Sequence, residues 1–142
     1  MLTSDDRWEI SDVLSRYCIA ADSRNLALLD DVFTQDVACI FQTGSRTGRD
    51  SVRDFMGSIL KNLTATQHNV TTSVVTESAD GAEGTTHLIV QHLREGAEGG
   101  ETFAMGGTYY DRFRRENGAW RIYRRELIGS WRTGNPDVMI RT

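Results

Sequence analysis

Asp22 and His68 are the residues whose types and positions best fit proton-transfer chemistry. Asp22 ends the first apolar-patterned segment of the chain, and His68 begins a later one. A neutral imidazole can abstract a proton near pH 7 when a carboxylate bonded to its other ring nitrogen fixes the tautomer and stabilises the imidazolium. The two residues could form such a dyad. Their spacing alone favours a helix-end aspartate and an ordinary hydrogen-bonded strand histidine over a dyad, and both interpretations stay open at this point.

A tyrosine and a second histidine could complete a site around this pair. Tyr17 lies on an apolar stripe, so its ring packs inward and its hydroxyl needs a hydrogen-bond partner. It is either a core residue or a group that meets a ligand. His87 and His92 lie on opposite faces of one predicted strand, because side chains alternate along a strand. His92 shares its face with Leu88 and Val90, which makes it the better candidate for an apolar cavity.

The first half of the chain is predicted to be mainly helical. Thr3 and Asp6 fit a capping box, and the apolar stripe that follows recurs at three- and four-residue steps until Asp22. A short second helix is predicted next, with three apolar residues on one face: Leu26, Leu29 and Phe33. Further along the chain we expect a first strand over residues 37–41, a loop over residues 43–49 and a third helix over about residues 50–62.

After the third helix the apolar periodicity changes to two residues. Long strands rich in threonine, valine, isoleucine and aromatic residues are predicted over residues 67–78, 83–95, 101–115 and 119–132. Asn117-Gly118 between the last two is a strong hairpin signal. Gly106-Gly107 would weaken the middle of a strand unless it serves a bulge or a bend. A bend at this point would close a cone.

This order of elements predicts an α+β domain. Helices that precede a set of antiparallel strands typically cover one face of the sheet. A strongly curved antiparallel sheet covered by three helices of the N-terminal half forms a cone around a hydrophobic cavity. The expected wall of that cavity includes aromatic and sulfur-containing side chains that suit a flat, apolar ligand: Phe41, Phe55, Met56, Met105, Tyr109 and Trp131.

Length and composition fit one domain that binds no nucleic acid. The 142 residues are enough for a single core, expected over about residues 5–132, with a short tail over residues 133–142 after a turn at Pro136. The formal net charge is −4, which argues against a nucleic-acid partner. The arginines of residues 112–132 alternate with acidic residues, so most of them fit a solvated face.

Other features point to a cytoplasmic protein without cofactor or metal. The first ten residues are polar and acidic, and no apolar run is long enough to span a membrane. Cys18 and Cys39 lie in apolar-patterned segments and are expected to be buried free thiols. The sequence contains neither a glycine-rich phosphate loop nor a cluster of residues with metal-ligand spacing.

A set of motifs runs through most of the chain in a familiar order. The last hairpin carries Gly-Gly-Thr-Tyr-Tyr-Asp-Arg-Phe over residues 106–113 and Asn-Gly-Ala-Trp-Arg-Ile over residues 117–122. Earlier come Tyr17, Asp22, a Leu-Leu-x-x-x-Phe-Thr-x-Asp run over residues 28–36, and Thr-Gln-His at residues 66–68. In order and spacing these motifs resemble the SnoaL-like domains of the nuclear transport factor 2-like superfamily, over roughly residues 5 to 132. The resemblance implies a cystatin-like roll.

The resemblance also favours the dyad interpretation. In the dehydratases and the dehydrochlorinase of this superfamily, positions that match Asp22 and His68 form an Asp–His dyad in the cavity. Tyr17 would then meet a substrate oxygen. Arg125 matches the cavity arginine of the dehydrochlorinase and would stabilise a developing anion or a leaving group. The predicted first strand lacks the acidic base of ketosteroid isomerases, which counts against an isomerase mechanism.

Together these expectations describe a cofactor-independent enzyme of the lyase or cyclase kind. It would abstract a proton with an Asp–His dyad and dehydrate or cyclise a hydrophobic cyclic or polyketide-like substrate. The alternative is a non-catalytic small-ligand-binding or accessory-subunit module of the same fold. Because the open faces of such curved sheets commonly pair, a homodimer or higher homo-oligomer is expected.

Overall fold

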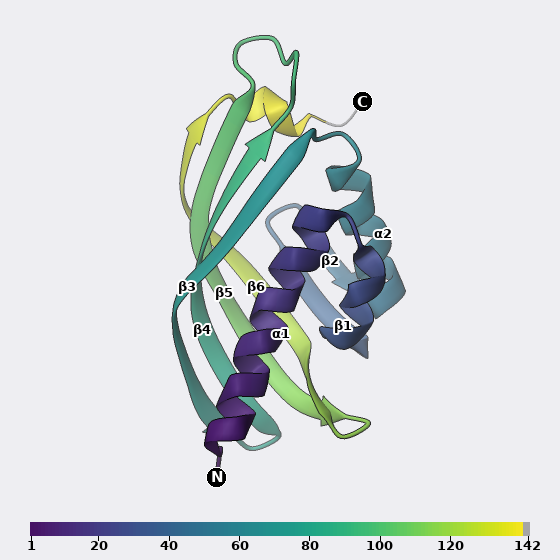
Figure 1. The fold of residues 1–142 in the computed structure, drawn as a ribbon, viewed down its shortest axis with the longest axis vertical. Helices are drawn as coiled ribbons and strands as arrows, with labels where there is room; N and C mark the ends of the chain where they lie inside the picture. Colours follow the sequence, from purple (N-terminus) through teal and green to yellow (C-terminus); the bar gives the residue numbers. More distant parts are fainter. Residues whose placement is uncertain (141–142) are drawn as a thin grey trace.

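A curved six-stranded sheet forms one wall of the molecule, and helices pack on its concave side (Figure 1). The computed structural model describes residues 1–140, so residues 141 and 142 of the predicted tail lie outside the described residues. The strand order is β2-β1-β6-β5-β4-β3. The strands are β1 (Phe33–Phe41), β2 (Gly44–Thr47), β3 (Ala65–Ser78), β4 (Gly81–Leu93), β5 (Thr102–Glu116) and β6 (Ala119–Gly134). The α+β class and the four long antiparallel strands are confirmed, although β1 pairs with β6 in parallel, which makes the sheet mixed.

Helix α1 (Ser4–Ser23) lies along the long strands and carries the first predicted site residues (Figure 1). Its capping box is present: the Thr3 hydroxyl accepts from the Asp6 amide, and the Asp6 carboxylate accepts from the Thr3 amide. The predicted apolar stripe is buried and includes Tyr17 and Cys18. The helix ends at Ser23, and its C-terminal cap, Arg24, has a left-handed backbone with φ 63°. Tyr17 therefore faces the interior, and Asp22 stands in the last helical turn.

The segment after α1 differs from the prediction at two places. The short second helix is a single 3₁₀ segment, η1 (Leu26–Asp31), and Phe33 begins β1 instead of ending that helix. Parallel pairing explains the early start of the strand, because the Val32 carbonyl already accepts from the Ile122 amide. The predicted loop over residues 43–49 contains β2, which turns back at Gly44 and pairs with β1. Helix α2 (Arg49–Leu60) agrees with the predicted third helix within two residues at each end.

The predicted bend at Gly106-Gly107 is a β-bulge. Across from it on β6, Gly106 pairs with Trp131 and Gly107 pairs with Gly129, so one residue of β6 is left over. The Trp131 indole lies against Gly106, where an added Cβ would stand 2.1 Å from its Nε1 atom. The indole takes the space that a side chain at residue 106 would fill. At the tip of the same strand pair, Asn117 and Gly118 both have positive φ, as the predicted tight hairpin requires.

The described part of the predicted tail, residues 133–140, packs onto the domain. Residues Pro136–Met139 form a second 3₁₀ segment, η2, beside the end of the sheet that carries the β4–β5 loop (Figure 1). Val138 is fully buried and packs with Leu63 and Phe103 in a small second core. The side-chain amide of Asn135 donates to the backbone carbonyls of residues 98 and 100, which fixes the turn that leads into η2. The segment therefore belongs to the folded unit.

Both cysteines are buried free thiols, as predicted. Burial raises the pKa of Cys18 to about 11 and that of Cys39 to about 12, so neither is a thiolate at neutral pH. None of the described helices is long and apolar enough to cross a membrane. The homo-oligomer stays a prediction. The two strands that flank β5 expose apolar side chains outside the cavity: Ile89 on β4, and Ile128 and Trp131 on β6.

Candidate functional site

A cavity of about 190 Å³ lies between the concave face of the sheet, α1 and α2. Most of the predicted site residues contribute to its wall: Tyr17, Phe41, Phe55, Met56, His68, His92, Met105 and Tyr109. The wall contains no lysine, arginine, aspartate or glutamate among the described residues. The volume is below the roughly 300–1,000 Å³ of pockets for drug-sized ligands. The cavity therefore suits a small, uncharged, largely apolar molecule.

Asp22 and His68 are brought together at the polar end of this cavity. Nδ1 of His68 lies 2.7 Å from Oδ1 of Asp22, and the backbone amide of His68 donates to Oδ2 at 2.8 Å. The pair joins the end of α1 to the start of β3, which are 46 residues apart in sequence. His68 lines the cavity, whereas Asp22 lies behind it. The contact with Asp22 occupies Nδ1 and leaves Nε2 as the nitrogen available to a ligand.

The Asp22 carboxylate is held in its charged form. Burial alone would raise its pKa, but the hydrogen bonds from the His68 side chain and backbone and from Thr66 outweigh burial and lower the pKa below its ordinary value. A carboxylate that accepts several hydrogen bonds in this way stays ionised at neutral pH. Asp22 can therefore orient the His68 ring and stabilise the imidazolium that forms when the ring takes up a proton.

His92 presents a second imidazole to the cavity. It is 6% exposed, and its Nδ1 atom lies 2.9 Å from the Phe103 carbonyl oxygen. A carbonyl can only accept, so Nδ1 carries the proton of the neutral ring and Nε2 is an acceptor. Burial lowers the pKa of His92, which keeps the ring neutral near pH 7. His87 is exposed on the other face of β4, as the alternation of side chains predicted.

Tyr17 and Tyr109 form the floor of the cavity. Their rings meet edge to face with centroids 5.8 Å apart, and Tyr17 also meets the His68 ring with centroids 6.0 Å apart. Burial raises the pKa of Tyr17 to about 12 and raises that of Tyr109 well above its ordinary value. Both hydroxyls are therefore protonated at neutral pH. Their mutual hydrogen bond lowers the pKa of Tyr17 and raises that of Tyr109, so Tyr109 donates to Tyr17 and the Tyr17 hydroxyl is the one that can donate to an oxygen in the cavity.

Arg125 lies beneath these tyrosines and not in the cavity wall. Its guanidinium is 4.5 Å from the ring centroid of Tyr17 and 3.7 Å from that of Tyr109. Nε and Nη2 donate to the two carboxylate oxygens of Asp111 at 2.7 and 2.8 Å. The pair is 1% exposed on both sides. Arg125 therefore belongs neither to a solvated face nor to the cavity surface, and the structure gives it no direct reach to a ligand in this cavity.

Trp131 is also outside the cavity. It is 45% exposed and covers Gly106 on the opposite face of the sheet from Tyr109. The bulge between Gly106 and Gly107 leaves an extra residue in β6 and so reverses the inward and outward alternation beyond it. This shift of register is the physical reason why Trp131 does not line the pocket.

Several wall residues were not among the predicted site residues. Leu88 and Val90 on β4 had been placed on the same face as His92 without being counted as site residues, Leu127 lies on β6, and Leu63 follows α2. The remaining additions come from α1, the β1–β2 turn, α2, the start of β3 and η2: Ala21, Gln42, Thr43, Ile59, Leu60, Thr66 and Met139. The Thr-Gln-His run had pointed to Thr66. Met139 had no signal in the sequence, because its place depends on the tail folding back.

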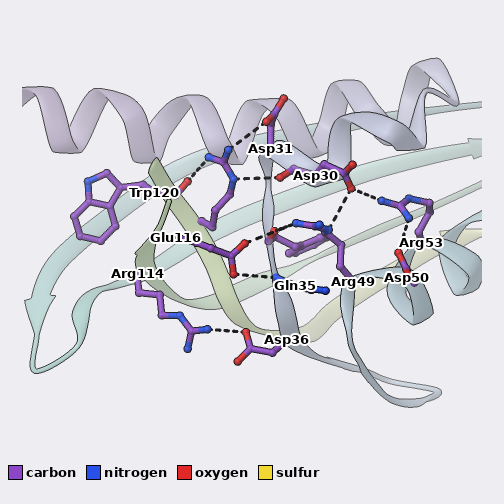
Figure 2. Close-up of polar contacts among 12 residues, drawn as sticks. Asp30, Asp31, Gln35, Asp36, Arg49, Asp50, Arg53, Arg114, Glu116 and Trp120 are labelled. Atoms are coloured by element: carbon purple, nitrogen blue, oxygen red, sulfur yellow. Dashed lines mark hydrogen bonds and ion pairs between the residues drawn. The ribbon is translucent and has the colours of Figure 1, made fainter. Parts of the chain in front are cut away.

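A separate network of charged side chains joins η1, α2, β1 and β5 (Figure 2). Asp30 of η1 forms ion pairs with Arg49 and Arg53, both on α2. Glu116 on β5 accepts from the Gln35 amide and lies 3.8 Å from Arg49. These charges pair mainly with one another, so the network fixes α2 against the sheet. No group of described residues has the composition of a metal site.

Comparison with known proteins places this fold and cavity in a family. The family model for the SnoaL-like domain matches residues 3–126, so the chain belongs to the SnoaL-like domain family. This confirms the resemblance seen in the sequence. Sequence comparison with curated proteins gives no match.

Solved structures from bacteria share the fold over nearly the whole chain. A provisionally named scytalone dehydratase from Novosphingobium aromaticivorans is 20% identical, with a TM-score of 0.81 over 90% of this chain and 86% of that one. A hexachlorocyclohexane dehydrochlorinase from Novosphingobium barchaimii is 18% identical, with a TM-score of 0.81 over 96% and 94%. A Nostoc punctiforme protein with a cystatin-like fold is 20% identical, with a TM-score of 0.72 over 91% and 94%. At these identities the likeness shows the fold alone.

Proposed function

We propose that the protein is a cofactor-independent enzyme of the lyase or cyclase kind in which His68 is the general base and Asp22 its orienting partner. The observation that carries the proposal is the 2.7 Å contact between Nδ1 of His68 and Oδ1 of Asp22 at the wall of an apolar cavity. A half-buried carboxylate in contact with Nδ1 holds the tautomer that leaves Nε2 unprotonated, which is the form that a general base requires. The two related enzymes with this fold are named for eliminations, which is consistent with proton abstraction.

The proposed reaction is the dehydration, or the cyclisation, of a hydrophobic cyclic or polyketide-like substrate. In the dehydration, Nε2 of His68 takes a proton from a carbon next to a carbonyl group. The electron pair of that C–H bond forms a double bond as the hydroxyl group on the neighbouring carbon leaves. The imidazolium returns its proton to the departing oxygen, so the products are the unsaturated compound and water, and His68 is neutral again.

The tyrosines at the cavity floor would stabilise the charge that develops on the carbonyl oxygen. The Tyr17 ring lies edge to face with the His68 ring, and both side chains line the same cavity. A neutral hydroxyl aimed at an enolate oxygen in a water-poor site acts as an oxyanion donor. Arg125 contributes from below through its contacts with both rings, because a cation favours negative charge on a neighbouring oxygen.

The proposal is tested with a panel of cyclic β-hydroxyketones and phenolic polyketide-type compounds that fit a small cavity. Loss of water gives a conjugated product, which is followed by its ultraviolet absorbance. On an accepted compound, His68→Ala is expected to lower kcat by about 10²- to 10⁴-fold, the usual contribution of a positioned general base. His87→Ala, an exposed histidine on the opposite face of β4, is the matched control and should leave kcat unchanged.

The non-catalytic alternative predicts a different result with the same panel of compounds. A carrier or accessory module would bind apolar compounds in the cavity, as followed by quenching of tyrosine and tryptophan fluorescence, without converting any of them. Full turnover by His68→Ala on an accepted compound would rule out the dyad mechanism.

A further inference from the structure

We infer that Arg24 and Thr66 are positioning residues that hold the Asp22 carboxylate so that His68 keeps its proton on Nδ1. Neither residue belonged to the predicted site, and Arg24 does not line the cavity. The inference rests on the proposed function, because it concerns the group that orients the proposed base. It is drawn from a chain of hydrogen bonds that runs from the end of α1 through Thr66 to the dyad.

The hydrogen bonds form an unbroken path. Nη1 of Arg24 donates to Oγ1 of Thr66 at 2.9 Å, and the Thr66 hydroxyl donates to Oδ1 of Asp22 at 2.9 Å. Oδ1 is the same oxygen that lies 2.7 Å from Nδ1 of His68. Arg24 is held in place by two further bonds, from Nη1 to the Ala21 carbonyl at 2.9 Å and from Nη2 to the carbonyl of residue 63 at 3.4 Å.

The groups on this path can donate and accept hydrogen bonds in only one order, from Arg24 toward Asp22. A guanidinium can only donate, so the Thr66 oxygen must accept from Arg24. The single proton of the Thr66 hydroxyl is then free to point toward Asp22. Oδ1 of Asp22 receives this proton, and Oδ2 receives the backbone amide proton of His68. With both oxygens accepting, Asp22 is a carboxylate, and Nδ1 of His68 must be the protonated nitrogen. Arg24 thereby acts on the His68 tautomer through two side chains, those of Thr66 and Asp22.

The backbone of Arg24 supports a role beyond helix termination. Arg24 is the C-terminal cap of α1 and has a left-handed backbone with φ 63°. Glycine or asparagine is the usual residue at such a position, because other side chains are strained there. An arginine in this conformation directs its guanidinium back across the helix end to Thr66. Strained residues of this kind concentrate at functional sites.

The test reads the His68 tautomer directly by ¹⁵N NMR of histidine-labelled protein at pH 7.5. In the wild-type protein, Nδ1 is expected to show the shift of a protonated ring nitrogen and Nε2 that of an unprotonated one. In Arg24→Gly and Thr66→Val, the two shifts should move toward each other as the other tautomer becomes populated. Thr66→Ser keeps the hydroxyl and should restore the wild-type pattern.

Two controls separate this effect from general loosening of the fold. His92 donates to the Phe103 carbonyl without involving Arg24 or Thr66, so its ring shifts should be the same in every variant. Arg7→Ala removes another α1 arginine, one that donates to the Val75 carbonyl far from the dyad, and should leave His68 unchanged. Unchanged His68 shifts in both Arg24→Gly and Thr66→Val would overturn the inference.

Turnover distinguishes the failure of this inference from failure of the proposed function. On an accepted substrate, Arg24→Gly should lower kcat by about 10- to 100-fold, the scale for outer groups that orient a functional histidine, with KM nearly unchanged because Arg24 does not touch the cavity. A moved tautomer without activity on any compound would support the positioning role and count against the enzyme. A lower kcat with an unmoved tautomer would refute the positioning role and leave the enzyme intact.

Discussion

Arg125 and Asp111 form a two-point ion pair in which both side chains are 1% exposed. The guanidinium lies beneath the tyrosines that floor the cavity, and Arg125 is the largest fully buried side chain among the described residues. Desolvation would lower the pKa of Arg125, but the attraction of Asp111 outweighs it and raises the pKa. The charge under the floor is therefore permanent.

The first prediction concerns this pair. Asp111→Ala should reduce the free energy of unfolding by about 3–5 kcal/mol, because it leaves a buried cation without its partner. Arg125→Met with Asp111→Leu should lose much less, since both charges then leave the core together. Urea unfolding followed by circular dichroism measures both variants. An equal loss in the single and the double variant would show that packing, and not the unpaired charge, sets the cost.

The second prediction concerns acid stability and Asp22. The pKa of Asp22 is lowered in the folded state, so its contribution is present above the unfolded value of about 3.9 and is lost as pH falls through the lower folded value. Asp22→Asn should therefore lose less stability than the wild type between pH 5 and pH 3. Urea midpoints of the variant and the wild type are compared across this range. The pKa values of Asp6 and Asp36 are also lowered, but both residues are present in both proteins, so their effects cancel in the difference. Parallel curves for the two proteins would contradict the prediction.

The third prediction concerns His92. Burial lowers its pKa, so below about pH 6.5 the unfolded chain takes up a proton at this residue while the folded chain does not. The stability of the wild type should therefore fall as pH drops from 7 to 5. His92→Gln should flatten this part of the curve, whereas His87→Gln should not, because His87 is exposed. The measurement is the urea midpoint at intervals of half a pH unit. A slope that persists in His92→Gln would place its origin elsewhere.

The fourth prediction compares the two glycines of the bulge. An added Cβ at Gly107 would lie 2.5 Å from the backbone carbonyl oxygen of Ile128, which cannot move without breaking the sheet register. At Gly106 the added atom meets only the Trp131 indole, an exposed side chain that can swing away. Gly107→Ala should cost about 1–3 kcal/mol, as overpacking usually does, and Gly106→Ala should cost less. Thermal unfolding of both variants gives the order, and the reverse order would refute this account of the bulge.

Much of the fold could be predicted because its signals are local. The capping box at Thr3 and Asp6, the apolar stripe of α1 and the Asn117-Gly118 turn each depend on residues that are close in sequence. The parts that differed depend on distant partners. Phe33 left its predicted helix because β1 pairs with β6, and residues 44–47 became a strand because β1 offered a free edge. No pattern within those short segments records the partner strand.

The same distinction between local signals and distant partners applies to the candidate site. The sequence by itself determined which residues could do the chemistry, since Tyr17, Asp22, His68 and His92 follow from side-chain type, strand alternation and family motifs. Only the tertiary structure decided which of them meet. It joined Asp22 to His68 across 46 residues, placed Arg125 under the floor with Asp111, and turned Trp131 outward at the bulge. It also brought Arg24 and Thr66 to the dyad. Hydrogen bonds and ion pairs act over a few ångströms in space, and distance along the chain does not fix distance in space until the sheet and helices have packed.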